Sequence, residues 1–288
     1  MTIQRYEVFN KVVQLQSITK AGNELNLTQS GVSHAVKSLE DELGLNLLIR
    51  NRGGVKLTRE GEKVYQHTLN IMNEYNNLNQ EASALKGIET GEIKVGTFSS
   101  ITMYWLPLII KQFKTEYPNI NINVIEDEHE TVEKYVESGE LDCCFTIASN
   151  EKNIEFIPLK KDKLLCIVST ENPLSKQDTI NLEQLEHYPL IRSRKDWFYE
   201  VNELLSQYKI NLTVKYEISS DHSMIALVKE NLGINIRPEL VLTNAPPGIR
   251  AIEFDKDIYR IIGLGINNRP SHATKRFIST VTDLYQTI

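Results

Sequence analysis

Five polar residues in the segment 28–44 have side chains suited to hydrogen bonding with DNA bases and phosphates. Helical periodicity places them on one half of a predicted helix, opposite an apolar stripe. A helix in the major groove needs short polar groups and cations in its N-terminal half, with no carboxylate facing phosphate. The first acidic residue of the segment is Glu40. The five candidates are Gln29, Ser30, Ser33, His34 and Lys37, with Gln29 and Ser33 the best suited to base edges.

A basic hairpin is predicted directly after this helix. Residues 45–50 and 55–58 have the pattern of short strands around a glycine-rich turn, Asn51-Arg52-Gly53-Gly54. Arg50, Arg52 and Lys56 would hold phosphates or reach into the minor groove. Taken alone, the hairpin is equally compatible with a surface turn that carries incidental arginines. Together, the helix and the hairpin predict a DNA-binding wing beside a reading helix.

The elements that position these residues follow from local signals. Two helices are expected over residues 4–15 and 17–25, and a turn over 26–28 leads to Thr28 as the cap of the third helix. That helix ends at Gly44. Two helices joined by a three-residue turn have the spacing of a helix-turn-helix. The buried stripe of the third helix comprises Val32, Val36, Leu39 and Leu43.

Residues 59–88 predict one long helix. Val64, Ile71, Leu78 and Leu85 recur every seven residues, and no proline or glycine interrupts the segment between Gly61 and Gly87. Such heptads require a second helix along their length. The alternative is a helix packed only on its own domain. A dimerisation helix is favoured, since a palindromic DNA site requires two copies of the reading head.

Composition limits the remaining classes. The chain has 288 residues and a net charge of -6; the first sixty residues hold eight basic and six acidic side chains, whereas the rest hold 24 and 32. This asymmetry predicts two domains with different partners. No apolar segment is long enough to span a bilayer, and no secretory signal is recognisable. Three cysteines cannot form a disulfide framework, so the cytoplasm is the expected location.

Residues 16–61 resemble the winged helix-turn-helix of LysR-type transcriptional regulators almost throughout. The matching string is QSITKAGNELNLTQSGVSHAVKSLEDELGLNLLIRNRGGVKLTREG. The resemblance implies an α/β multidomain fold with three parts: a winged helix-turn-helix over 1–58, a linker helix over 59–88, and a two-lobed effector-binding domain like a periplasmic binding protein over 89–288. The resemblance also implies that the protein binds double-stranded DNA and a small-molecule co-inducer, and that it associates with itself as a dimer or a dimer of dimers. RNA polymerase is a further candidate partner.

The rest of the chain agrees with two α/β lobes. Strand and helix signals alternate over residues 92–147, which is typical of a parallel lobe. Lobe 1 is expected over 89–162 and 264–288 and lobe 2 over 163–263, with hinges near 162–164 and 261–264. A lobe 2 helix is expected over 196–208.

Ligands of such lobes lie beyond the C-terminal ends of the strands. This rule selects residues that also resemble helix caps. Arg192 is the expected anion anchor, unless it pairs with Asp196 or Glu200 on the adjoining helix. The effector candidates are Ser99, Ser100, Thr102, Thr146, Arg192, Ser193, Ser220 and Asp221.

The sequence gives little support for an enzymatic or metal-binding function. No nucleophile elbow, phosphate-binding glycine loop or zinc motif is present, so we expect no enzymatic activity, no cofactor and no metal. A solute-binding or enzymatic α/β protein with an added DNA-binding head is the alternative. Cys143, Cys144 and Cys166 lie on predicted buried strands, which favours core packing over redox sensing.

Overall fold

The N-terminal head consists of three helices and a hairpin. The computed structural model describes residues 2–51, 54–148, 154–193, 205–208, 210–218 and 220–287. The head comprises α1 (Ile3–Leu15), α2 (Ile18–Leu25), α3 (Gln29–Leu43), β1 (Leu48–Asn51) and β2 (Gly54–Leu57). The predicted ends of α3 are confirmed: Thr28 accepts a hydrogen bond from the Gly31 amide, and Gly44 ends the helix at a φ of 67°. At the start of α2, Ser17 accepts a hydrogen bond from the Lys20 amide.

The core of the head forms along the predicted apolar stripe of α3. Val32, Val36 and Leu39 are fully buried. Glu40 is only 8% exposed, because its carboxylate turns toward the interior of the head. It accepts hydrogen bonds from the amides of Leu47, at 2.8 Å, and Leu48, at 3.3 Å. Glu40 therefore fixes the start of the hairpin, and its charge is directed away from the polar face of α3.

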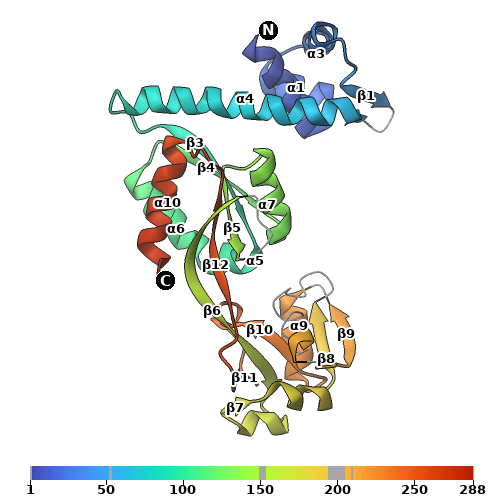
Figure 1. The fold of residues 1–288 in the computed structure, drawn as a ribbon, viewed down its shortest axis with the longest axis vertical. Helices are drawn as coiled ribbons and strands as arrows, with labels where there is room; N and C mark the ends of the chain where they lie inside the picture. The colour runs from blue at the N-terminus through green and yellow to red at the C-terminus, as the bar shows by residue number, and fades with distance from the viewer. Residues whose placement is uncertain are drawn as a thin grey trace.

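The long helix α4 (Arg59–Ala84) packs on its own domain, whereas its pairing with a second copy stays a prediction. Its N-terminal half packs on the head through buried Tyr65 and Leu69, and the Thr68 hydroxyl donates to Asn10 Oδ1 at 2.6 Å. Beyond this contact the heptad positions are exposed, with Leu78 at 66%. Figure 1 shows α4 as a rod between the head and the effector domain, extending past the head at its C-terminal end.

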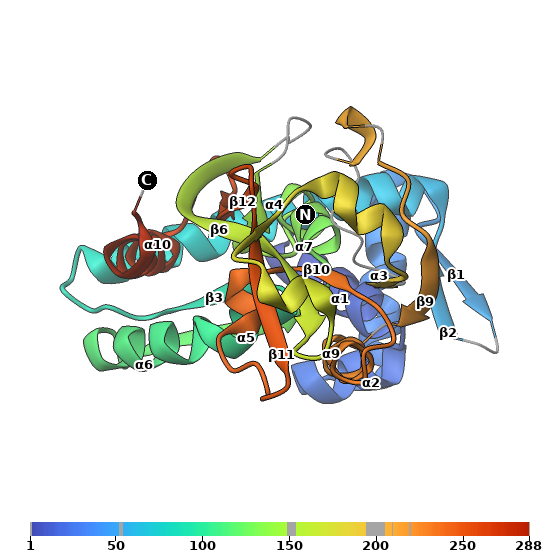
Figure 2. The same cartoon turned by 90° about the horizontal axis from the view of Figure 1, so that it is seen from below.

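Lobe 1 of the effector domain is built on parallel strands, as predicted. Strand β3 (Gly91–Thr97) pairs in parallel with β4 (Ile120–Glu126) and β5 (Cys143–Ile147). The helical segment after β3 is divided at Trp105 into α5 (Ser99–Tyr104) and α6 (Leu106–Glu116) (Figure 2). The lobe is completed by α7 (His129–Ser138), β12 (Tyr259–Ile266) and α10 (His272–Tyr285).

Lobe 2 shares the same sheet. The strand order is β4-β3-β5-β12-β6-β11-β7, with β10 also paired to β6. A separate parallel pair, β8–β9, lies beside α9. Residues 196–204 of the helix expected over 196–208 lie outside the described residues. The elements are β6 (Glu155–Ser169), β7 (Thr179–Ile180), β8 (Leu190–Ser193), β9 (Val214–Ile218), α9 (Asp221–Lys229), β10 (Asn235–Pro238), β11 (Ile249–Phe254), and the short helices η1 (Pro173–Lys176), η2 (Leu182–His187) and η3 (Glu239–Leu242).

Two strands connect the lobes, and Figure 1 shows β6 running through both. Lys163 of β6 pairs with Tyr259 of β12, whereas Leu164 pairs with Pro238 of lobe 2. The first crossing therefore falls within the predicted hinge at 162–164. The second precedes the predicted 261–264, because Ile262 already pairs with β5 of lobe 1.

Candidate DNA-binding and effector-binding sites

The predicted reading face of α3 is accessible. Gln29, Ser30, His34 and Lys37 are exposed, and Ser33 is partly buried. The Ser30 hydroxyl lies 3.0 Å from Thr28 Oγ1, so it remains near the helix cap. These positions leave the polar groups of the first two turns of α3 available to a partner.

One of these candidates has an internal partner. The Lys37 ammonium pairs with Asp41 one turn later at 2.9 Å, and both side chains are 63% exposed. This hydrogen bond raises the pKa of Lys37 above its ordinary value. Exposed pairs of this kind are weak. A phosphate could therefore replace Asp41 as the partner of the lysine at little cost.

The hairpin presents its two described basic residues on opposite faces. Arg50 pairs with Val55 and Ile49 with Lys56, so successive side chains alternate across the ribbon. Both Arg50 and Lys56 are exposed. Arg52 lies outside the described residues. The arrangement allows contacts on either side of the hairpin.

A cavity of about 300 Å³ separates α5 of lobe 1 from α9 and the segment after η3 in lobe 2. Two of the predicted effector residues, Ser99 and Ser100, line it. Sequence reasoning missed most of the wall, because it is made by exposed positions of α9 and by a loop that no local signal marks. The lining residues are Ser99, Ser100, Met103, Tyr104, His222, Ile225, Ala226, Lys229, Val241, Asn244, Ala245 and Pro246.

The other polar effector candidates are engaged elsewhere. The Thr102 hydroxyl contacts Thr97 Oγ1 at 3.3 Å, and the Thr146 hydroxyl donates to Glu133. Ser220 caps α9, which is the helix-cap alternative considered above. None of these residues lines the cavity.

Arg192 pairs with Glu217 on the neighbouring strand β9, and does not line the cavity. Its two expected partners, Asp196 and Glu200, lie outside the described residues. Ser193 ends β8 opposite Ile218, and Asp221 begins α9; their side chains lie outside the described part of the chain. An anion-binding role for Arg192 would thus require exchange of Glu217 for the ligand.

A buried ion pair lies at the hinge beneath the cavity. Arg260 of β12 and Asp162 of β6 are 3% and 4% exposed. The Arg260 guanidinium donates to Asp162 Oδ2 at 2.8 Å and to Ser100 Oγ at 3.3 Å. Asp162 Oδ1 accepts from the Leu240 amide at 2.9 Å. The pair therefore connects both crossing strands to α5 and to η3.

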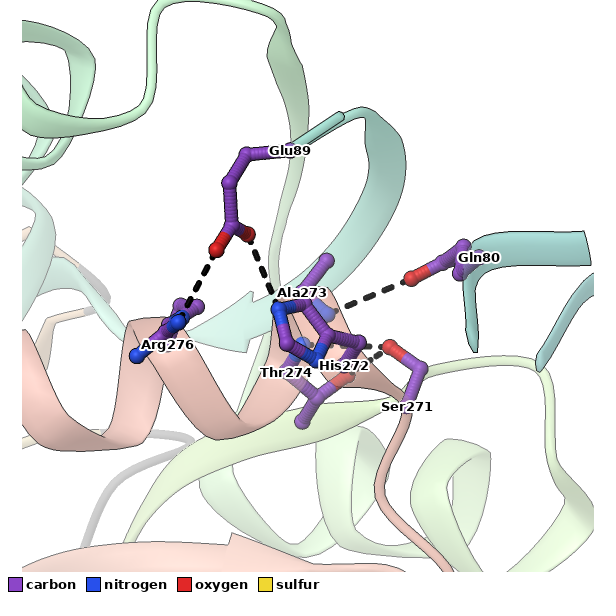
Figure 3. Close-up of polar contacts among 7 residues, drawn as sticks. All are labelled: Gln80, Glu89, Ser271, His272, Ala273, Thr274 and Arg276. Carbon is purple, nitrogen blue, oxygen red and sulfur yellow. Dashed lines mark hydrogen bonds and ion pairs between the residues drawn. The ribbon is translucent and has the colours of Figure 1, made fainter. Parts of the chain in front are cut away.

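The linker helix docks on lobe 1 through polar contacts (Figure 3). The side-chain Oε1 of Gln80 accepts from the Ala273 amide at the start of α10, at 3.2 Å. Glu89 lies 2.9 Å from His272 Nε2 and accepts from Arg276 at 2.9 Å. Burial alone would raise the pKa of Glu89, but hydrogen bonds from Arg276 and His272 outweigh it and lower that pKa. No sequence pattern indicated this contact.

Cys143, Cys144 and Cys166 are buried thiols outside any disulfide bond, in agreement with core packing. Burial raises the pKa of Cys166 to about 12 and raises that of Cys143 as well. No cluster of metal-ligating side chains occurs among residues 2–51, 54–148, 154–193, 205–208, 210–218 and 220–287. Within the same segments, no helix is long and apolar enough to cross a membrane.

Known proteins match nearly the whole length of the chain. Residues 3–62 match the family described as bacterial regulatory helix-turn-helix protein, lysR family, and residues 86–286 match the LysR substrate binding domain. The chain is 31% identical over 290 residues to the uncharacterized HTH-type transcriptional regulator YvbU of Bacillus subtilis (strain 168), with 99% of each chain covered.

Solved structures share the fold at lower identity. Full-length OxyR from Pseudomonas aeruginosa aligns with a TM-score of 0.82 at 22% identity, covering 98% of this chain and 94% of OxyR. Full-length CbnR complexed with its target DNA aligns with a TM-score of 0.66 at 18% identity, covering 98% of this chain and 99% of CbnR. The head, the linker helix and the two lobes thus recur together, and the protein belongs to the LysR family of DNA-binding transcriptional regulators.

Proposed function

We propose that this protein acts as a dimer that reads an inverted-repeat promoter site through α3 and responds to a small effector held between the lobes. The single observation that carries the DNA-binding part is the exposed polar face of α3, free of carboxylates until Asp41. Gln29 and Ser33 would contact base edges in the major groove. Arg50 and Lys56 would contact phosphates or the minor groove from the hairpin.

The exposed part of α4 supports the dimer. Ile71, Leu78 and Leu85 are 39%, 66% and 82% exposed, and they continue the heptad pattern beyond the part of α4 that packs on the head. An apolar stripe of this length is typical of a helix that pairs with a second copy. Two heads on paired helices would match the two half-sites of a palindrome.

The effector part rests on the cavity between the lobes. A ligand that contacts both walls can favour one lobe arrangement over another by its differential affinity. Docking of α4 on lobe 1 gives that change a route toward the heads. The matches to regulator family models over both the head and the effector domain favour a regulator over a solute-binding protein or enzyme with an added DNA-binding head.

A gel-shift series tests the DNA contacts. Lys56→Ala should weaken binding to every duplex and reduce the salt dependence by about one unit of slope, because one phosphate contact is lost. Gln29→Ala should instead reduce the preference for the correct half-site over a mismatched one. Lys275→Ala, an exposed lysine on α10, is the control and should change neither quantity. Equal losses on matched and mismatched duplexes would exclude Gln29 from base reading.

A further inference from the structure

We propose that the cavity between α5 and α9 selects a small monoanion with an apolar body, such as an aromatic or branched aliphatic monocarboxylate, whose charged group pairs with Lys229. The inference rests on the effector response proposed above, and it specifies the chemistry of that site. It also replaces Arg192 with Lys229 as the anion anchor.

The walls of the cavity are mainly apolar. Met103 and Tyr104 come from lobe 1, whereas Ile225, Val241 and Pro246 come from lobe 2. Met103 lines the cavity and is 51% exposed when no ligand is bound. Covering such side chains with an apolar ligand removes them from water and stabilises the complex.

The polar groups of the cavity favour one negative charge. Its twelve lining residues include no aspartate or glutamate, although the residues after position 60 are acidic overall. Lys229 supplies the fixed positive charge. Within the part of the chain that the structure describes, no carboxylate lies within ion-pair distance of its ammonium group. An unpaired lysine beside apolar walls selects an anion more strongly than a neutral ligand of the same shape.

Helix α9 fixes the distance between the charged group and the second polar region. His222, Ala226 and Lys229 follow one another at spacings of four and three residues, so they share one face of the helix. The seven helical steps from His222 to Lys229 correspond to roughly 10 Å along the axis. Ser99 and Ser100 line the cavity as well. A ligand can therefore pair with Lys229 while a hydroxyl or carbonyl substituent contacts the serines or His222.

The volume limits the size of the ligand. The cavity of about 300 Å³ lies at the small end of the range for small-molecule pockets, which is roughly 300–1,000 Å³. It suits a monocarboxylate with one ring or a short branched chain.

Contact with both lobes makes the ligand relevant to regulation. The Tyr104 hydroxyl already donates to the Val241 carbonyl across the cavity, at 3.2 Å. Ser100 lines the cavity and also accepts from Arg260 of the hinge pair. A ligand seated here touches the groups that set the spacing of the lobes.

Isothermal titration calorimetry of the full chain tests the proposal with four probes: phenylacetate, the branched 4-methylpentanoate, the neutral phenylacetamide and the dianionic glutarate. The two monocarboxylates should bind, and phenylacetate should bind at least tenfold more tightly than either phenylacetamide or glutarate. Lys229→Met should weaken phenylacetate about tenfold and leave phenylacetamide unchanged. Ala226→Phe, which fills the cavity without altering charge, should abolish binding of both.

Lys275→Met is the matched control and should bind like the unaltered protein. Unchanged melting temperatures without probe would show that the variants fold. The proposal is overturned if neither monocarboxylate binds, if the amide or glutarate binds as well as phenylacetate, or if Ala226→Phe leaves binding intact. Gel shifts on the same preparations separate two failures: lost cavity binding with intact DNA binding refutes this inference alone, whereas absent DNA binding refutes the proposed function.

Discussion

Removing one partner of the buried pair between Asp162 and Arg260 should strongly destabilise the effector domain. Asp162→Asn removes the charge that compensates the Arg260 guanidinium, which is 3% exposed, but keeps an acceptor for the Leu240 amide. Breaking a buried pair by removing one partner costs about 3–5 kcal/mol. We expect about 3 kcal/mol, at the low end, because Ser100 still accepts from Arg260 at 3.3 Å. In a domain of this size that corresponds to a fall in Tm of roughly 6–12 °C.

Urea unfolding followed by tryptophan fluorescence isolates this effect in the full chain, since both tryptophans, Trp105 and Trp197, lie outside the head. Combining Asp162→Asn with Arg260→Gln should recover most of the loss, because no buried charge is then uncompensated. The control is Glu253→Gln, which removes the exposed partner of Lys163 at the same hinge and should cost less than about 1 kcal/mol. A double variant as unstable as Asp162→Asn, or equal losses for Asp162→Asn and Glu253→Gln, would refute the reasoning.

Four further outcomes are expected. Leu78→Lys should raise the dimer dissociation constant about a hundredfold or more in analytical ultracentrifugation, because the proposed dimer contact loses one leucine from each protomer. Asn76→Lys, at another exposed position of α4, should leave the constant unchanged. Gly61→Ala should destabilise the head by about 1–3 kcal/mol in circular dichroism melts, since a Cβ would lie 2.1 Å from the Leu47 carbonyl oxygen; a gain in stability would contradict this close approach. The three buried thiols should react with Ellman's reagent only after denaturation. The pKa of Glu89 lies below its usual 4.5, so its contribution should be complete above about pH 4.5 and disappear as the pH falls through the lowered pKa; hydrogen exchange at the start of α10 should increase during that fall after intrinsic-rate correction, and should also increase at neutral pH in Glu89→Gln.

The head was predictable because its signals are local. Thr28 and Gly44 mark the ends of α3 because their residue types favour helix caps. Helical periodicity then places the apolar stripe and the polar residues on different sides of the helix. Glu40 shows the limit of that reasoning. A helical wheel places Glu40 on α3 but does not show which groups its carboxylate meets. The Leu47 and Leu48 amides that donate to it lie across a turn whose path helical periodicity does not describe.

The effector cavity could be located but not resolved from sequence. The rule that ligands lie near strand ends found Ser99 and Ser100, whose position depends on the strand directly before them. Lys229 was missed because it lies at the far end of α9, and only the packing of α9 opposite α5 makes it part of the cavity. Arg192 was selected by residue type, yet its partner Glu217 comes from a strand that is adjacent in space and distant in sequence.

The strengths of the two contacts made by α4 determine where an effector can act. On the head side, α4 packs through buried Tyr65 and Leu69, so separation would expose apolar surface. On the lobe 1 side it is held by hydrogen bonds such as that between Gln80 and Ala273, each worth about 0.5–1.5 kcal/mol. A change in lobe spacing that strains this assembly should therefore move lobe 1 along α4 before it moves the head. The angle between the effector domain and the linker helix is then the quantity that a bound effector can change, while each head remains fixed to its own helix.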